Sequence, residues 1–188
     1  MATLVSVGTG LIGTLVGATI AWLAGRRQHR VETTYAMHQE FHAAEMTKSR
    51  GLAGKTVRKH YPKNYDDLRR DLPPKKTQHV WNVMYFYQRL WLAIKYENIY
   101  TKNVPEMFGE NFWWWYLKSY QKQLNPEEKS KEEEEEEEEE GVEEKKNMGL
   151  NWQAAQNIEE LWTWMNKEAD PGHKKRWHER AMEMADPM

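Results

Sequence analysis

The fold is decided by residues 77–94, TQHVWNVMYFYQRLWLAI, in which large apolar side chains recur at intervals of three and four. This is the period of one face of an α-helix, and it continues over four turns. The residues that share the face are Val80, Val83, Met84, Tyr87, Leu90, Trp91 and Ile94. We therefore predict an amphipathic helix that begins near Thr77 and buries this face.

The next segment predicts a second helix that is apolar on two sides. Pro105 suits the first helical position, and Asn125-Pro126 ends the pattern. Four large rings follow one another around a single turn, and they cannot all face one core. We expect Trp114 to point outward. We also expect this group to form a partner surface: Trp113, Trp114, Trp115 and Tyr116.

Toward the C-terminus, residues 127–146 contain 13 Glu against 4 Lys, a net charge of −9. With almost no apolar side chain to bury, this run predicts a solvated linker. Two helices should follow it, the first capped by Asn151 and the second by Asp170 before Pro171. No segment alternates between apolar and polar residues as a strand does. The predicted class is all-α, a small helical bundle.

Toward the N-terminus, Leu4 to Ala24 contains no charged residue and, as a helix, is about 30 Å long. Arg26, Arg27 and Arg30 follow it, and no Lys or Arg precedes it. This asymmetry predicts an uncleaved transmembrane helix with its N-terminus outside and the rest of the chain in the cytoplasm, at an inner or plasma membrane.

Small residues recur every four positions within this span, at Gly13, Gly17 and Ala21. Such a stripe lets two backbones approach closely, so it predicts contact with another membrane helix or with a second copy of the chain. The alternative is that glycine and alanine are simply common in membrane helices.

The whole chain thus divides into five parts. We expect a helix to continue from Gln28 to about Arg50, and Gly51 and Gly54 to interrupt it. The parts are an anchor (1–25), a basic juxtamembrane helix with turns (26–76), an aromatic helical hairpin (77–125), an acidic linker (126–148) and C-terminal helices that pack on the hairpin (149–188).

The formal net charge of −2 conceals these differences, because residues 26–76 hold 13 Lys or Arg against 6 Asp or Glu. Anionic lipid headgroups are the nearest partners for this excess, with Arg26, Arg27 and Arg30 closest to the bilayer. Nucleic acid is not expected, since the acidic run would compete for the same patch. The run itself is either a plain linker or a cover that folds back on the basic patch.

Few motifs point to chemistry. The chain has no cysteine, which excludes disulfides, thiolate nucleophiles and cysteine-ligated metals. Ser49 to Thr56 ends like a phosphate-binding loop but has serine in place of its first glycine. His38, His42 and Glu45 share a helical face and are weak candidates for zinc ligands. We therefore predict no cofactor and no catalytic constellation.

Two stretches resemble a known family. WNVMYFYQRL (81–90) and PEMFGENFWWWY (105–116), after an N-terminal span and a polar helix, are similar to bacterial proteins of the domain of unknown function 4760 family. The resemblance covers roughly residues 1–125 and the helix from Asn151, while the acidic run and the triple tryptophan depart from it. It implies a membrane anchor and a helical fold, and no catalytic residue.

Together these features predict a single-pass membrane protein that acts by binding, as a scaffold, assembly or accessory subunit. Its partners would be the bilayer and a membrane protein or a second copy. The alternative is a membrane-tethered sensor or metal-dependent enzyme, with an aromatic pocket around Trp91, Trp113 and Tyr116 and a metal at His38 and His42.

Overall fold

A computed structural model describes residues 2–60, 71–120 and 149–183, with side chains described from 14 to 60, 71 to 118 and 153 to 183. These residues form helices and contain no strand, so the predicted all-α class is confirmed for them. The elements are α1 (Ala2–His42), α2 (Ala44–His60), α4 (Pro74–Lys95), η1 (Thr101–Asn103), α5 (Val104–Trp115), η2 (Tyr116–Tyr120), α8 (Gly149–Glu168) and α9 (Pro171–Glu183).

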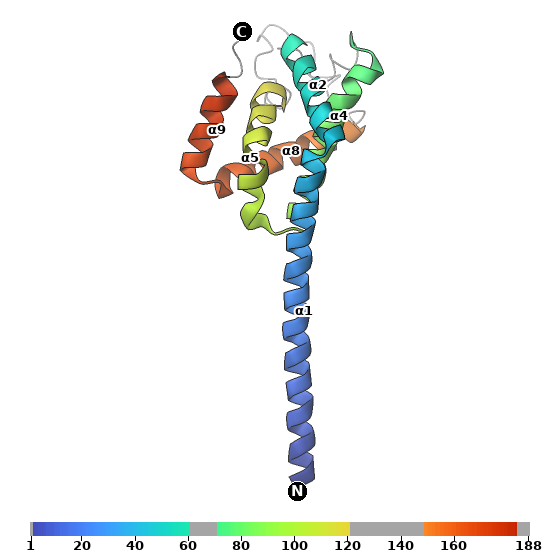
Figure 1. Cartoon of the computed structure of the whole chain (residues 1–188), viewed down its shortest axis with the longest axis vertical. Coiled ribbons are helices and arrows are strands. Elements are labelled where there is room, and N and C mark those ends of the chain that lie inside the picture. Colours follow the sequence, from blue (N-terminus) through green and yellow to red (C-terminus); the bar gives the residue numbers. More distant parts are fainter. Residues whose placement is uncertain (1, 61–70, 121–148, 184–188) are drawn as a thin grey trace, which may run out of the picture.

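The chain has two visible parts, a stalk and a head (Figure 1). The stalk is residues 2–29 of α1, and the head is the rest of α1 with the other helices packed beside it. α1 is a single helix of 41 residues, which corresponds to about 60 Å. It therefore carries the chain from the tip of the stalk into the head without a hinge.

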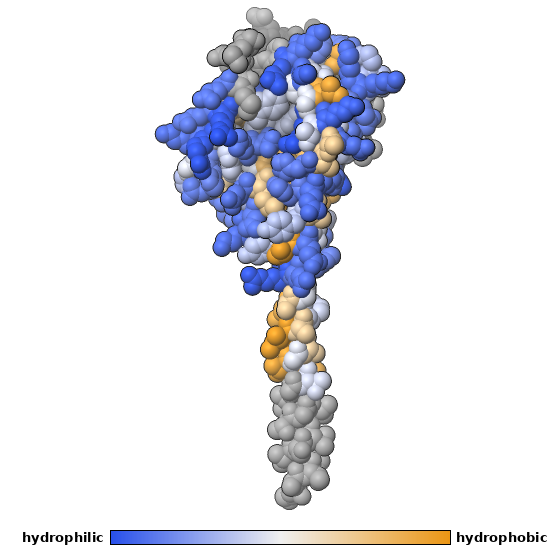
Figure 2. Space-filling model, viewed as in Figure 1, coloured by the Kyte–Doolittle hydropathy of each residue, from blue (hydrophilic) through white to orange (hydrophobic). Residues whose placement is uncertain are grey.

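Large apolar side chains cover the described end of the stalk, where Figure 2 shows orange surface below the blue head. They are between 54% and 68% exposed: Leu15, Val16, Ile20, Trp22 and Leu23. Among the residues with described side chains, no helix is both long and apolar enough to cross a membrane.

Inside the head, α5 lies centrally, in contact with α1, α8 and α9. α2 packs along α4, and α8 covers another part of α4. Aromatic rings from three helices fill the space between them. Phe41 of α1 lies 4.9 Å from Phe86 of α4, and Tyr87 of α4 lies 4.9 Å from Phe112 of α5, measured between ring centroids. These buried rings hold the end of α1 in the head.

The helix predicted from residues 77–94 is confirmed as α4. The predicted face is buried at Val80, Val83, Met84, Tyr87, Leu90 and Ile94. The helix starts three residues earlier than expected, because Pro74 occupies its first turn, where a proline has no hydrogen bond to lose. Pro105 likewise lies in the first turn of α5, as predicted.

The predicted interruption at Gly51 and Gly54 is wrong, since α2 is helical from Ala44 to His60. Each glycine costs a helix about 1 kcal/mol, and burial of Ala53 and Val57 on the same helix outweighs this cost. The break falls at Ala43 instead, so the helix predicted to reach Arg50 is divided. Because Ser49 to Thr56 is helical, it is not a loop that could cradle phosphate.

The acidic run lies outside the described residues, which resume at residue 149. The interpretation of residues 126–148 as a linker, or as a cover on the basic patch, therefore stays a prediction.

Candidate functional site

The loop that follows α4 joins the head to α1. The backbone N–H of Tyr100 donates to Oγ1 of Thr34 at 2.8 Å, and it lies 3.3 Å from the carbonyl oxygen of Arg30. The hydroxyl of Thr34 in turn donates to the same Arg30 carbonyl at 2.8 Å. Thr34 is only 2% exposed, so these bonds are shielded from water. They fix the loop against α1 at the level where the stalk enters the head.

Glu97, in the same loop, forms ion pairs with two arginines of α1 on either side of the boundary between stalk and head. Its carboxylate accepts a hydrogen bond from Nη2 of Arg30 at 2.6 Å, and Nη2 of Arg26 lies 3.8 Å away. Its φ angle is +53°, a left-handed conformation that normally favours glycine or asparagine. The backbone turn at Glu97 is what directs a carboxylate from the end of α4 toward two arginines of α1.

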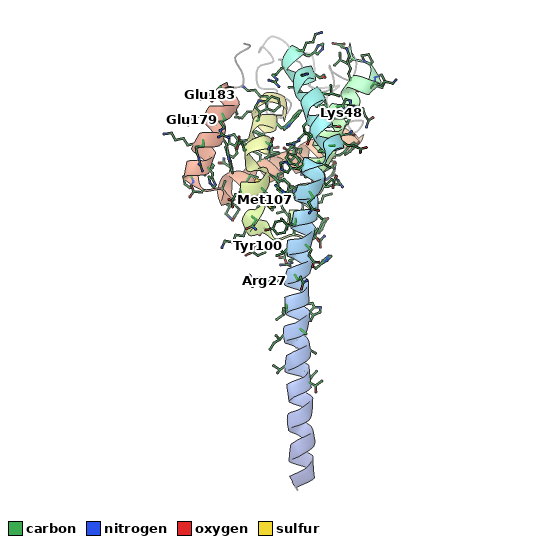
Figure 3. The ribbon with its side chains drawn as sticks, in the orientation of Figure 1. Arg27, Lys48, Tyr100, Met107, Glu179 and Glu183 are labelled. Atoms are coloured by element: carbon green, nitrogen blue, oxygen red, sulfur yellow. The ribbon has the colours of Figure 1, made fainter. Side chains whose placement is uncertain are left out.

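Aromatic rings accompany the arginines at this level. The guanidinium of Arg26 lies 5.6 Å from the ring centroid of Trp22, and that of Arg27 lies 6.0 Å from the ring of Tyr100. Figure 3 shows Arg27 beside α1, just below Tyr100 at the base of the head. Both distances are typical of weak cation–π contacts.

These side chains surround a hollow of about 310 Å³, which we call the junction cleft. It is lined by Leu23, Arg26, Arg27, Arg30 and Tyr100. The cleft has three guanidinium groups, and the one neighbouring carboxylate, Glu97, pairs with Arg26 and Arg30, so the local balance is +2. Within the described part of the chain Arg27 has no ion-pair partner, and the buried Nε of Arg30 has no hydrogen-bond acceptor. The junction cleft therefore has the charge and the free donors to bind an anion.

The predicted aromatic partner surface is wrong, because all four of its rings are buried. Exposure is 5% for Trp113, 8% for Trp114, 3% for Trp115 and 8% for Tyr116. Trp114, predicted to point outward, packs on Gly54 of α2, where its ring approaches within 3.6 Å of the position a Cβ would take. The expectation failed because α5 is enclosed by helices on several sides rather than facing one core.

The aromatic pocket predicted around Trp91, Trp113 and Tyr116 is filled by another ring. Trp162 of α8 stacks on Tyr116 with centroids 3.9 Å apart and planes 1° from parallel, and it lies 4.2 Å from Trp113. Burial raises the pKa of the Tyr116 hydroxyl above its ordinary value. Trp91 instead donates its indole N–H to Glu160 at 2.7 Å. Trp113 and Tyr116 therefore pack against Trp162 rather than line a pocket.

The two candidate histidines do meet, but without a third ligand. The rings of His38 and His42 lie 4.4 Å apart. The break at Ala43 ends the helical register that would have placed Glu45 one turn further along the same face. Burial, followed by the neighbouring His38, lowers the pKa of His42. In the described ranges, no group of three His, Asp or Glu residues is placed to hold a metal ion.

One contact that the sequence reading missed joins α5 to α9. The ring of Trp177 lies directly on Gly109, and a Cβ at that glycine would fall 2.3 Å from Cη2 of the ring. Beside it, Arg180 of α9 pairs with Glu110 of α5. A glycine in the middle of an otherwise aromatic helix was the available signal, since such a glycine often marks a close approach.

One partly exposed aromatic group of the head lies on α4. Trp81 and Tyr85 stack with centroids 5.3 Å apart and planes 20° from parallel, and Tyr85 is 43% exposed. We call these two residues the α4 pair.

Comparison with protein families, with curated proteins and with solved structures finds no match to this chain. Function must therefore be inferred from the geometry of the stalk, the junction cleft and the α4 pair.

Proposed function

We propose that this chain is a single-pass membrane protein whose stalk crosses the bilayer with its N-terminus outside and holds the helical head at the cytoplasmic surface. The observation that carries the proposal is the junction between stalk and head. There, along one unbroken helix, exposed apolar residues give way to arginines. Trp22 lies beside Arg26 and Tyr100 beside Arg27 at this junction, and tryptophan and tyrosine are enriched where a membrane meets water.

Within this proposal the protein acts by binding, as a scaffold, assembly or accessory subunit. Gly17 and Ala21 are exposed on the stalk, on the side that the sequence assigns to contact with a second membrane helix or a second copy. The α4 pair is one aromatic surface available to a partner in place of the buried residues 113–116. The resemblance to the domain of unknown function 4760 family agrees with an anchored, non-catalytic role and stays a prediction.

The anchor is tested by washing membranes from cells that express the full chain with alkaline carbonate. The unaltered chain should stay in the membrane pellet. Val16→Lys with Ile20→Lys should release it, because a lysine near the centre of a span, as at position 16, costs about 2.5–3.5 kcal/mol, and the second lysine adds a smaller cost nearer its end. The matched control is Leu52→Lys with Tyr85→Lys, which changes two exposed apolar residues of the head and should leave the chain in the pellet. Release of the unaltered chain by carbonate would refute the anchor.

The orientation is tested separately with single cysteines, since the chain has none of its own. A membrane-impermeant maleimide should label Thr3→Cys in intact cells and label Lys48→Cys only after lysis. The opposite pattern would reverse the proposed orientation.

A further inference from the structure

The junction cleft lies at a defined height above the apolar part of α1. The uncharged run ends at Ala24, and a helix rises 1.5 Å per residue. Arg26 and Arg27 are therefore about 3–5 Å beyond the end of this run, and Arg30 about 9 Å beyond it. A bilayer adds about 5–7 Å of headgroup on each side of its hydrocarbon core. If the stalk crosses the bilayer as proposed, the cleft lies in the layer of lipid phosphates.

The chemistry of the cleft suits a phosphate ester. A guanidinium group presents a planar fork of N–H donors that matches two phosphate oxygens, and Arg27 offers its fork with no competing carboxylate in the described chain. Leu23 lines the same hollow on its stalk side and continues into the exposed apolar surface of Ile20. A lipid could thus place its phosphate among the arginines and its acyl chain along the stalk.

An anion of the chain itself lies beside the cleft, bound to two of the arginines that line it. The carboxylate of Glu97 takes the Nη2 donor of Arg30 and lies near Arg26, so it occupies the position that a phosphate would need on these two side chains. The Glu97 side chain is 69% exposed, which leaves it free to move aside.

We propose that the junction cleft binds the phosphate of one anionic phospholipid, and that the Glu97 carboxylate is the internal anion which this phosphate displaces. The proposal rests on the anchor proposed above, and it goes beyond a general attraction between basic residues and an anionic membrane. It assigns a single site, the arginine with no competing carboxylate (Arg27) as a phosphate ligand, and a residue that weakens binding (Glu97).

The test uses the full chain in detergent micelles, with native mass spectrometry to count bound lipids. Phosphatidylglycerol should bind at one saturable site more tightly than phosphatidylcholine, whose phosphate is accompanied by a cation. Arg27→Gln should weaken this binding about fivefold, which corresponds to about 1 kcal/mol for one basic residue near an anionic surface. Glu97→Gln should strengthen it by a similar factor. Lys48→Gln, the same charge change at the far end of the head in Figure 3, should leave it unchanged.

Four outcomes would overturn the proposal. Equal losses for Arg27→Gln and Lys48→Gln would show bulk electrostatics without a site. Equal binding of the two lipids would remove the requirement for an anion. Saturation by glycerol 3-phosphate at the concentrations of the lipid would assign the cleft to a soluble phosphate ester. Weaker binding by Glu97→Gln would show that Glu97 positions Arg30 rather than competing. Each can occur while the chain still resists carbonate, so the proposed anchor would survive.

Discussion

Replacing Gly109 with alanine tests how closely α9 packs on α5. The added Cβ would lie 2.3 Å from Cη2 of Trp177, 2.7 Å from Cζ3 and 2.8 Å from Cζ2. Carbon atoms in a protein core pack about 3.5–4.0 Å apart, so the ring would have to withdraw by more than about 1 Å. It has little freedom to do so, because Trp177 is 6% exposed and lies between the rings of Trp113 and His173.

The expected cost follows from two opposing effects. Overpacking of a core costs about 1–3 kcal/mol, and an approach this short belongs at the upper end of that range. Alanine favours a helix over glycine by about 0.5–1 kcal/mol. The free energy of unfolding should therefore fall by about 2 kcal/mol, which lowers the Tm of a chain of this size by about 4–8 °C.

Tryptophan fluorescence of the full chain in detergent, heated at one fixed rate, measures this change. Two control substitutions add the same methyl group to α2. At Gly51 it would meet nothing within 4 Å, and at Gly54 it would make an ordinary contact of 3.6 Å with Trp114. Both should raise the Tm slightly, because the gain in helix propensity is unopposed.

A double-mutant cycle identifies the contact itself. Trp177→Phe removes the part of the ring that the new methyl group would strike, so Gly109→Ala should cost less in that background than in the unaltered chain. The packing described for α5 and α9 would be refuted if Gly109→Ala raised the Tm as Gly51→Ala does.

Three further substitutions probe hydrogen bonds and charges in the head. Thr34→Val should cost about 1–2 kcal/mol and speed hydrogen exchange at the Tyr100 amide, which loses its 2.8 Å acceptor; unchanged exchange would contradict this. The hydrogen bond from Lys95 holds the pKa of Glu160 below its ordinary value of 4.5. Its ionised form therefore stabilises the fold at neutral pH, and the deficit of Glu160→Gln should shrink as the pH falls below 4.5. Burial lowers the pKa of His42 in the folded chain, so below pH 6.5 the unfolded chain binds this proton more readily than the folded chain does, and the fold loses stability. In His42→Asn the Tm should therefore decrease less as the pH is lowered below 6.5.

The helices that were predicted correctly are those whose evidence is local. The apolar period of α4 lies within residues 77–94, and Pro105 marks the start of α5 without reference to any other segment. The errors at Gly54 and Trp114 have one common cause, which is that α2 and α5 pack on each other. The contact that buries Trp114 joins it to a helix 60 positions earlier in the chain, and no local pattern contains that information.

In the junction cleft, too, the residues marked by local sequence were predicted and those brought in by distant contacts were not. Arg26, Arg27 and Arg30 were predicted to face lipid headgroups because they directly follow the uncharged run. Glu97 and Tyr100 were not predicted to join them, since the pair formed by Glu97 and Arg30 spans 67 positions. It depends on a left-handed residue after α4, a conformation that the sequence of a glutamate does not suggest.

Because α1 is unbroken, the direction in which the head projects from the helix axis is fixed relative to the faces of the stalk. With about 3.6 residues per turn, the residues that hold the head, Thr34 and Phe41, lie roughly a third of a turn around the helix from Gly17 and Ala21. If a neighbouring helix packs on that small-residue stripe, the head of this chain projects about a third of a turn away from the contact. In a symmetric pair, two heads would then point away from the shared axis, and their outer flanks would be open to other molecules. Inserting one residue into the stalk would rotate each head by about 100° and change which flank is presented.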